Sequence, residues 1–421
     1  MQPIDQPAAT ITSAHPTTRR IENHDEGKAW YWVLPDPLVL ADGRPVRDAR
    51  TWFGERRPEI FRLFESEIYG KAPGRPAEES FEIAESSDDA LKGAARRKQV
   101  VIHLSGAANG PAVDMLMYLP AHYTERVPLF LCMSFFPLQR VSDEPAIRLQ
   151  DEWDRNHARQ PGKLRANSPS FPIQEILGRG YGFAVIYYSQ IDPDFDGGLP
   201  QGVRAAYLPP GKTRPASDEW GTIAAWAWGA SRAMDYLQTD PDVDPARIAI
   251  MGHSRLGKTA LWTGAADPRF AMVVACSSGR GGASLARRNF GESIGDLGQR
   301  YGYQFCGNFQ KYGAHVTDMP VDSHELLGLI APRPLYLATA SLDLHSDPTG
   351  EFEAAVAAGP IYQLLGARGL ETIAPPPLDT AIMHDIGYHC HTGKHEVTAL
   401  DWAKILQFAD LKLRHNGHEA R

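Results

Sequence analysis

The chain of 421 residues lacks several features that would assign it to a specialised class of protein. Its four cysteines, Cys132, Cys276, Cys306 and Cys390, form no C-x-x-C pair, so we expect neither a disulfide framework nor a zinc ribbon. No apolar run is long enough to span a bilayer. The formal net charge is −8 and no long basic block is present, which argues against nucleic acid or an anionic membrane as the main partner.

The N-terminal region also lacks a recognisable signal. Residues 1–25 are polar and aperiodic, and we expect them to form a mobile arm. They have no basic start followed by an apolar stretch, so we expect a cytoplasmic protein, or a periplasmic or secreted one if a signal was removed beforehand. Residues 26–421 are predicted to form a single domain, in which 26–95 wrap over the body, and we expect a monomer.

Buried strands and amphipathic helices alternate along most of the chain. Two alternating segments joined by a Gly-containing link predict an antiparallel hairpin, at 99–104 and 113–119. Further strands and helices are predicted from apolar runs and helical spacing, with strands at 127–136, 182–188, 248–251, 271–275 and 334–339, and helices at 59–69, 222–237, 352–365 and 400–411. This order predicts an α/β-hydrolase fold, a three-layer sandwich with a mostly parallel central sheet. The long Gly/Pro-rich segment 192–215 is expected to carry or shield a site.

The clearest functional signal lies in the stretch 245–264. Gly252, Ser254 and Gly257 spell G-x-S-x-G between an apolar run and residues at helical spacing. Strand, tight turn and helix are the context of a nucleophile elbow, which would expose the Ser254 hydroxyl above the sheet. We therefore predict a catalytic serine, although a serine that only caps a helix would fit the same motif.

A serine hydroxyl needs a base, and the base needs a carboxylate that orients it. In this fold the order along the chain is serine, acid, histidine. Asp343 follows the predicted strand 334–339 and is the candidate acid. Asp347 lies close by and competes with it, and either residue could be an ordinary turn aspartate.

The candidate base lies in a region rich in histidine, which we interpret as one loop: His384, His389, His391 and His395. His395 comes last, just before the final helix, and is our choice, with His389 as the alternative. Together with Cys390 these histidines could instead bind zinc. Because G-x-S-x-G already requires a histidine here, we expect no metal and no other cofactor.

Two basic residues follow the candidate nucleophile. The backbone N–H of Arg255 is the expected donor to the oxyanion, and its guanidinium adds positive charge at the same place. Lys258 lies one helical turn from Ser254, so both face one pocket unless Lys258 extends to solvent. These residues predict a substrate whose acyl part is carboxyl-derived or strongly polar.

The run GHSRLGK at 252–258, followed by TALWTGAADPRFA, resembles the bacterial branch of the glucuronoyl esterases, carbohydrate esterase family 15. The likeness continues in GGASLARRNFGESI at 281–294, DSHELLGLIAPRPLYL at 322–337 and IGYHCHTGKH at 386–395. It covers most of the chain. It implies an α/β-hydrolase fold without a metal, and cleavage of the ester between a glucuronic acid branch on xylan and an alcohol of lignin.

The resemblance also implies roles for single residues. By motif, Ser254 matches the nucleophile, His395 the base and Arg255 the arginine that supports the oxyanion. Lys258 and Glu292 match residues that hold the sugar hydroxyl groups.

The family places its acid in one of two positions. One follows the strand after the nucleophile, where many members have glutamate and this chain has Ser277. The other follows the next strand and is Asp343 here, so the resemblance implies Asp343 as the acid.

Two positions depart from the family pattern. Many bacterial members have a tryptophan over the sugar where this chain has His345, and a small or thiol residue where it has Arg280. We expect both side chains to face the substrate and to make the pocket more polar and more basic. The alternatives to a glucuronate esterase are an esterase for another polar ester, such as acetylated sugars, and a carbohydrate-binding protein that has lost catalysis.

Overall fold

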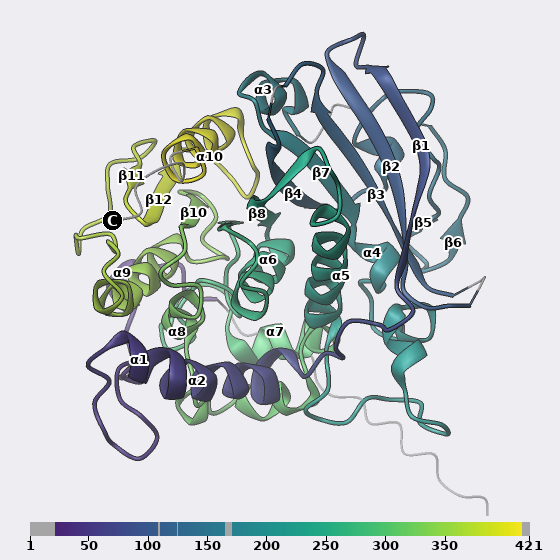
Figure 1. Ribbon diagram of the computed structural model, residues 1–421. Helices are drawn as coiled ribbons and strands as arrows, with labels where there is room; N and C mark the ends of the chain where they lie inside the picture. Colours follow the sequence, from purple (N-terminus) through teal and green to yellow (C-terminus); the bar gives the residue numbers. More distant parts are fainter. Residues whose placement is uncertain (1–21, 108–109, 124, 165–170, 415–421) are drawn as a thin grey trace, which may run out of the picture.

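The computed structural model describes residues 22–107, 110–123, 125–164 and 171–414, so most of the predicted arm lies outside the described residues. The main sheet has ten strands in the order β1-β2-β3-β7-β4-β8-β9-β10-β12-β11 (Figure 1). The strands are β1 (Ser80–Ala90), β2 (Ala95–His103), β3 (Ala112–Pro120), β4 (Val127–Ser134), β7 (Gly182–Tyr187), β8 (Val243–His253), β9 (Met272–Cys276), β10 (Leu335–Ala340), β11 (Ile382–Met383) and β12 (Ile386–His391), with a separate pair β5 (Glu152–Trp153) and β6 (Arg159–Gln160).

The centre of the sheet is parallel and its two edges are antiparallel. Strands β7, β4, β8, β9, β10 and β12 run parallel to their neighbours in this central block. The predicted hairpin is present as β2 and β3, and β1 extends it at the edge. Strand β1 lies within the segment 26–95 that we expected to wrap over the body. Its sequence is rich in charge because it is an exposed edge strand, which gives no apolar alternation to read.

Helices cover both faces of the sheet and make the predicted three-layer sandwich (Figure 1). One apolar core lies between the sheet and helices α2, α5, α6, α8 and α9, and the other lies between the sheet and helices α3 and α10. The helices are α1 (Ala49–Thr51), α2 (Arg57–Phe64), α3 (Ile173–Gly178), α4 (Tyr188–Ile191), α5 (Thr222–Leu237), α6 (Arg255–Ala266), α7 (Ile294–Tyr301), α8 (Ser323–Gly328), α9 (Pro348–Leu364) and α10 (Ala399–Lys412). None of them, within the described parts of the chain, is long and apolar enough to cross a membrane.

The segment interpreted as a histidine-rich loop is largely strand β12, so that prediction was wrong. His389 and His391 lie on this strand and are buried, whereas His395 lies beyond its end. The alternation of side chains along a strand puts His389 and His391 on one face and Cys390 on the other. Cys390 therefore does not join His389 and His391 in the zinc site that we considered as the alternative.

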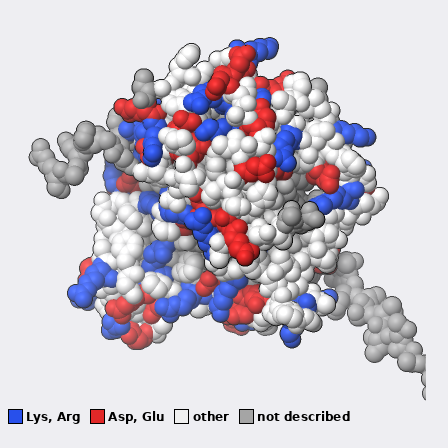
Figure 2. Space-filling model, turned by 45° about the vertical axis from the view of Figure 1, so that its right-hand side comes forward, with Lys and Arg blue, Asp and Glu red and all other residues white. Residues whose placement is uncertain are grey.

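The N-terminal segment is packed against the loop 288–292 from its first described residues. Asn23 pairs with Gly291, and Tyr31 pairs with Arg288, each through an isolated bridge. Residues 22–25, which we expected in a mobile arm, are held by these contacts. Figure 2 shows acidic and basic side chains intermixed on one face of the molecule, with no single basic patch on it.

Candidate active site

The central strands end at the same edge of the sheet, and the candidate residues follow these ends. Ser254 follows β8, Ser277 follows β9, Asp343 follows β10 and His395 follows β12. In open α/β sheets ligands bind outside the carboxyl ends of the strands, because loops from several strands meet there. The topology thus brings together residues that lie up to 141 positions apart in the sequence, from Ser254 to His395.

Ser254 sits in the strained turn that a nucleophile elbow requires. Its φ is +58° and its ψ −127°, in a region that non-glycine residues rarely occupy. The turn is tight because the backbone of Leu256 folds back on Gly252. A Cβ on Gly252 would lie 1.9 Å from the carbonyl oxygen of Leu256, so only glycine fits there. Helix α6 begins immediately after the serine, at Arg255.

Asp343 and His395 form the pair that a serine hydrolase needs. Oδ2 of Asp343 lies 2.6 Å from Nδ1 of His395. Burial raises the pKa of Asp343, but the hydrogen bond and charge attraction of His395 together with hydrogen bonds from Ser346 outweigh burial and lower the pKa, so the carboxylate stays ionised. With Nδ1 held by the acid, Nε2 of His395 is the nitrogen left to exchange a proton with Ser254.

Asp347 and His389, the alternatives to Asp343 and His395, make other contacts. Asp347 caps helix α9, accepts a hydrogen bond from Ser284 at 3.1 Å and forms an ion pair with Arg288. His389 is fully buried, and its Nε2 lies 2.7 Å from Asp401. Neither residue can replace Asp343 or His395 in the pair described above.

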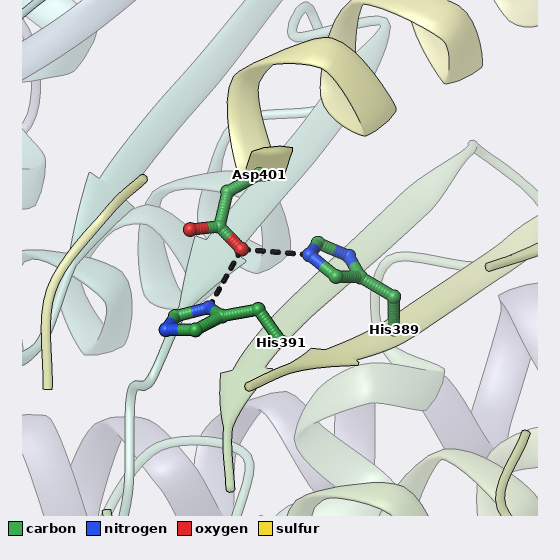
Figure 3. A group of neighbouring side chains, drawn as sticks. All are labelled: His389, His391 and Asp401. Carbon is green, nitrogen blue, oxygen red and sulfur yellow. Dashed lines mark hydrogen bonds and ion pairs between the residues drawn. The ribbon is translucent and has the colours of Figure 1, made fainter. Parts of the chain in front are cut away.

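His389, His391 and Asp401 form a compact buried group behind the loop that carries His395 (Figure 3). Oδ1 of Asp401 lies 2.7 Å from Nε2 of His389 and 2.9 Å from Nδ1 of His391. Nε2 of His391 lies 3.2 Å from the carbonyl of Lys394, next to His395. Both partners of His391, the Asp401 carboxylate and the Lys394 carbonyl, are oxygen acceptors. The three side chains could supply metal ligands, but these atoms already bond one another.

All eight predicted site residues line one cavity of about 300 Å³. The candidate catalytic residues and the other charged residues thus face the same space: Ser254, Arg255, Lys258, Arg280, Glu292, Asp343, His345 and His395. The segments that supply them are the elbow, the loop after β9, the loop before α7 and the loops after β10 and β12.

Arg255 is held by a carboxylate that the sequence did not single out. Asp194, from the long segment 192–215, forms an ion pair with the Arg255 guanidinium. The same carboxylate accepts hydrogen bonds from Tyr188 at 2.9 Å, Tyr303 at 2.9 Å and Gln304 at 2.8 Å. The only signal for Asp194 was its place in a long Gly/Pro-rich excursion, which we expected to carry or shield a site.

Lys258 and Glu292 are both buried at the cavity wall, with 7% and 4% of their surfaces exposed. Burial lowers the pKa of Lys258 to about 8, and the Glu292 carboxylate opposes this shift. Oε1 of Glu292 has no hydrogen-bond partner among the described residues. A buried ammonium and a buried, unpartnered carboxylate oxygen are well suited to hold hydroxyl groups of a ligand.

His345 and Arg280 differ in their contacts. Nδ1 of His345 lies 3.0 Å from Glu22 of the N-terminal segment, and its Nε2 lies 3.6 Å from Glu292. Arg280 is 2% exposed and donates to the main-chain carbonyls of residues 288, 290 and 292. Although Arg280 lines the cavity, these donors face the loop that carries Glu292. The remaining nitrogen, Nη1 of Arg280, has no hydrogen-bond partner among the described residues, so a role for Arg280 toward the substrate stays a prediction.

Comparison with known proteins places this site in a family. A family model described as "Glucuronyl esterase, fungi" matches residues 215–366. A carbohydrate esterase of an unknown prokaryotic organism is 42% identical over 397 residues, which is 92% of this chain and 91% of that protein.

Solved structures agree with this result. The glucuronoyl esterase from Solibacter usitatus is similar with a TM-score of 0.89 and 43% identity, over 92% of this chain and 100% of that chain. A glucuronoyl esterase of carbohydrate esterase family 15 from Teredinibacter turnerae is similar with a TM-score of 0.80 and 32% identity, over 94% of each chain. The chain therefore belongs to the glucuronoyl esterases of carbohydrate esterase family 15 and is a carboxylic ester hydrolase.

Proposed function

We propose that this protein hydrolyses esters of glucuronic acid or 4-O-methyl-glucuronic acid, as in glucuronoxylan, through an acyl-enzyme on Ser254. The observation that carries the proposal is the single cavity that joins Ser254 and the His395–Asp343 pair to the buried Lys258 and Glu292. A uronic acid has a carboxyl carbon for the serine to attack and ring hydroxyl groups for the two charged residues to hold.

The reaction follows from these positions. His395 takes the proton of the Ser254 hydroxyl as the oxygen attacks the ester carbonyl, and Asp343 stabilises the resulting imidazolium. The Arg255 N–H and guanidinium stabilise the oxyanion. The ester C–O bond then breaks, the alcohol leaves with the proton from His395, and water releases the glucuronate in a second cycle.

An acetylated sugar is a poorer fit to the same site. Its acyl part is an acetyl group with only a methyl beyond the carbonyl, which would leave a charged cavity of about 300 Å³ largely unfilled. Binding energy from the parts of a substrate remote from the reacting atoms is what positions those atoms, and an acetyl group offers none of it to Lys258 or Glu292.

A side-by-side assay tests the proposal. The methyl ester of glucuronic acid should be hydrolysed with a kcat/KM at least about tenfold above that of an acetylated xylose. A higher kcat/KM for the acetyl ester would overturn the assignment.

The variant His345→Trp, run in parallel, reports whether this position contacts the sugar, because a contact there should change KM for the glucuronate ester more than for the acetyl ester.

A further inference from the structure

The N-terminal segment 22–32 pairs antiparallel with the loop 288–292, which supplies Glu292 to the charged cavity. The N–H of Gly291 donates to the carbonyl of Asn23 at 2.8 Å. Glu22 directly precedes Asn23 in the chain, as Glu292 directly follows Gly291. The antiparallel pairing therefore brings Glu22 to the end of the loop at which Glu292 enters the cavity wall.

The Glu22 carboxylate faces three basic side chains. Its two oxygens lie 3.0 and 3.2 Å from Nδ1 of His345, and they also lie 3.2 Å from Nη2 of Arg300 and 3.1 Å from Nε2 of His24. Only 12% of the Glu22 side chain is exposed. Burial raises the pKa of Glu22, but hydrogen bonds with these three side chains and the charge attraction of His345 outweigh burial and lower the pKa, so the carboxylate is ionised.

The contact with Glu22 decides which nitrogen of His345 faces the cavity. An ionised carboxylate only accepts hydrogen bonds, so Nδ1 of His345 carries a proton and donates it to Glu22. Nε2 is then directed at Glu292 and lies 3.6 Å from its Oε1, the carboxylate oxygen without a hydrogen-bond partner among the described residues. Both His345 and Glu292 line the cavity that contains Ser254.

The main chains of His345 and Glu292 are fixed to each other without the help of Glu22. The N–H of Glu292 donates to the carbonyl of His345 at 3.0 Å. A Cβ on Gly291 would lie 2.6 Å from the same carbonyl oxygen, so the two loops are in close contact. By contrast, 45% of the His345 side chain is exposed, and packing restrains its ring less than it would a buried ring. The hydrogen bond with Glu22 therefore acts on the orientation of the ring.

We propose that Glu22 is a positioning residue of the sugar site, the part of the cavity formed by Lys258, Glu292 and His345. It holds the His345 ring so that Nε2 and the free Oε1 of Glu292 together bind neighbouring hydroxyl groups of the sugar ring. The N-terminal segment thereby becomes part of the substrate site. This inference rests on the proposed function, because it takes a glucuronate as the ligand.

A double-mutant cycle with methyl glucuronate as substrate tests the proposal. Glu22→Ala should raise KM about fivefold, the size of roughly one hydrogen bond, and leave kcat unchanged. His345→Ala should also raise KM. In the combined variant, Glu22→Ala should add nothing to the effect of His345→Ala, because Glu22 acts through the ring. Glu22→Gln keeps an oxygen that can accept from Nδ1 and should restore most of the lost affinity.

Glu26→Ala is the matched control. Glu26 lies on the same segment, pairs with Arg288 and accepts a hydrogen bond from Thr349 at 2.9 Å, and it does not line the cavity. The KM of Glu26→Ala should equal that of the unsubstituted protein. An equal rise in KM for Glu26→Ala and Glu22→Ala would mean that the segment only braces the loop, and the positioning role would be overturned.

Two further outcomes would also overturn the role of Glu22 while the esterase remains. One is a KM for Glu22→Ala equal to that of the unsubstituted protein. The other is a fivefold effect of Glu22→Ala that persists in the His345→Ala background, because Glu22 would then act through another residue. If the unsubstituted protein does not hydrolyse methyl glucuronate, the proposed function fails, and the role of Glu22 in the sugar site fails with it.

Discussion

Oδ2 of Asp343 lies 2.6 Å from Nδ1 of His395, and this contact links the loops that follow the neighbouring strands β10 and β12. The pair lies beside a serine held at φ +58° and faces a cavity whose other walls carry Lys258 and Glu292. This arrangement gives separate roles to the acid Asp343, to Arg255 at the oxyanion, to Lys258 at the sugar and to the buried group around Asp401.

Replacing the acid should remove most of the chemistry without unfolding the protein. We expect Asp343→Asn to lower kcat about 10⁴-fold, as expected when the histidine is held in the wrong tautomer. Steady-state kinetics on methyl glucuronate measures this loss. Asp347→Asn is the contrasting variant, because it removes the buried one of the three carboxylates that pair with Arg288 and should lower Tm more than kcat. A larger fall in kcat for Asp347→Asn would contradict the assignment of the acid.

Asp194 should act through Arg255. We expect Asp194→Asn to lower kcat about 10- to 100-fold with little change in KM, because a misplaced guanidinium stabilises the oxyanion less well, and loss of a whole oxyanion donor costs about 10²- to 10³-fold. Tyr303→Phe, which removes only one donor to the same carboxylate, should have a smaller effect on kcat. Equal loss in the two variants, or an effect confined to KM, would argue against this role.

Because of Lys258 we expect the pH profile of KM to have an alkaline limb, in which KM rises with pH. Burial lowers the pKa of its ammonium to about 8, so the charge is present below this pH and is lost as the pH rises through it. We expect KM for a glucuronate ester to rise above about pH 8, after correction for spontaneous hydrolysis. Lys258→Arg keeps a charge throughout this range and should lack the limb, whatever its absolute activity. A limb at the same pH in Lys258→Arg would assign it to another group.

The buried pair of His391 and Asp401 should be needed for stability. Asp401→Asn removes the carboxylate that both His389 and His391 contact, and a hydrogen bond to a charged group contributes about 1.5–3 kcal/mol. We expect a clear fall in Tm by differential scanning fluorimetry. Asp410→Asn, on the same helix α10 but with a side chain 30% exposed and paired with Arg179, should cost less than about 1 kcal/mol. Similar Tm values for the two variants would contradict this structural role of Asp401.

The sequence predicts those features that follow from a local residue pattern or from the order of residues along the chain. Helix α5 occupies the predicted range 222–237, because apolar spacing and small residues define it from end to end. The chain order of an α/β hydrolase led from Ser254 to Asp343 and His395, and these three residues line one cavity. In each case a rule about order or period was sufficient, and no long-range contact had to be known.

Other features depend on contacts between distant segments. We predicted a loop where strand β12 lies, because the strand ends in His389, Cys390 and His391, and histidines look polar in a sequence. All residues of β12 are nevertheless buried. Glu22 reaches His345 across 323 positions in the sequence, and Asp194 reaches Arg255 across 61. The main-chain carbonyls that accept hydrogen bonds from Arg280 belong to the segment 288–292, whose path the sequence pattern does not reveal.

The most direct test of the central claim is the hydrolysis of methyl glucuronate by Ser254→Ala, compared with the unsubstituted protein. The account predicts that the unsubstituted protein releases free glucuronate and that Ser254→Ala reduces kcat about 10⁶-fold, to the level that binding alone provides. Activity of Ser254→Ala within about tenfold of the unsubstituted protein would contradict the account, because the nucleophile would then lie elsewhere.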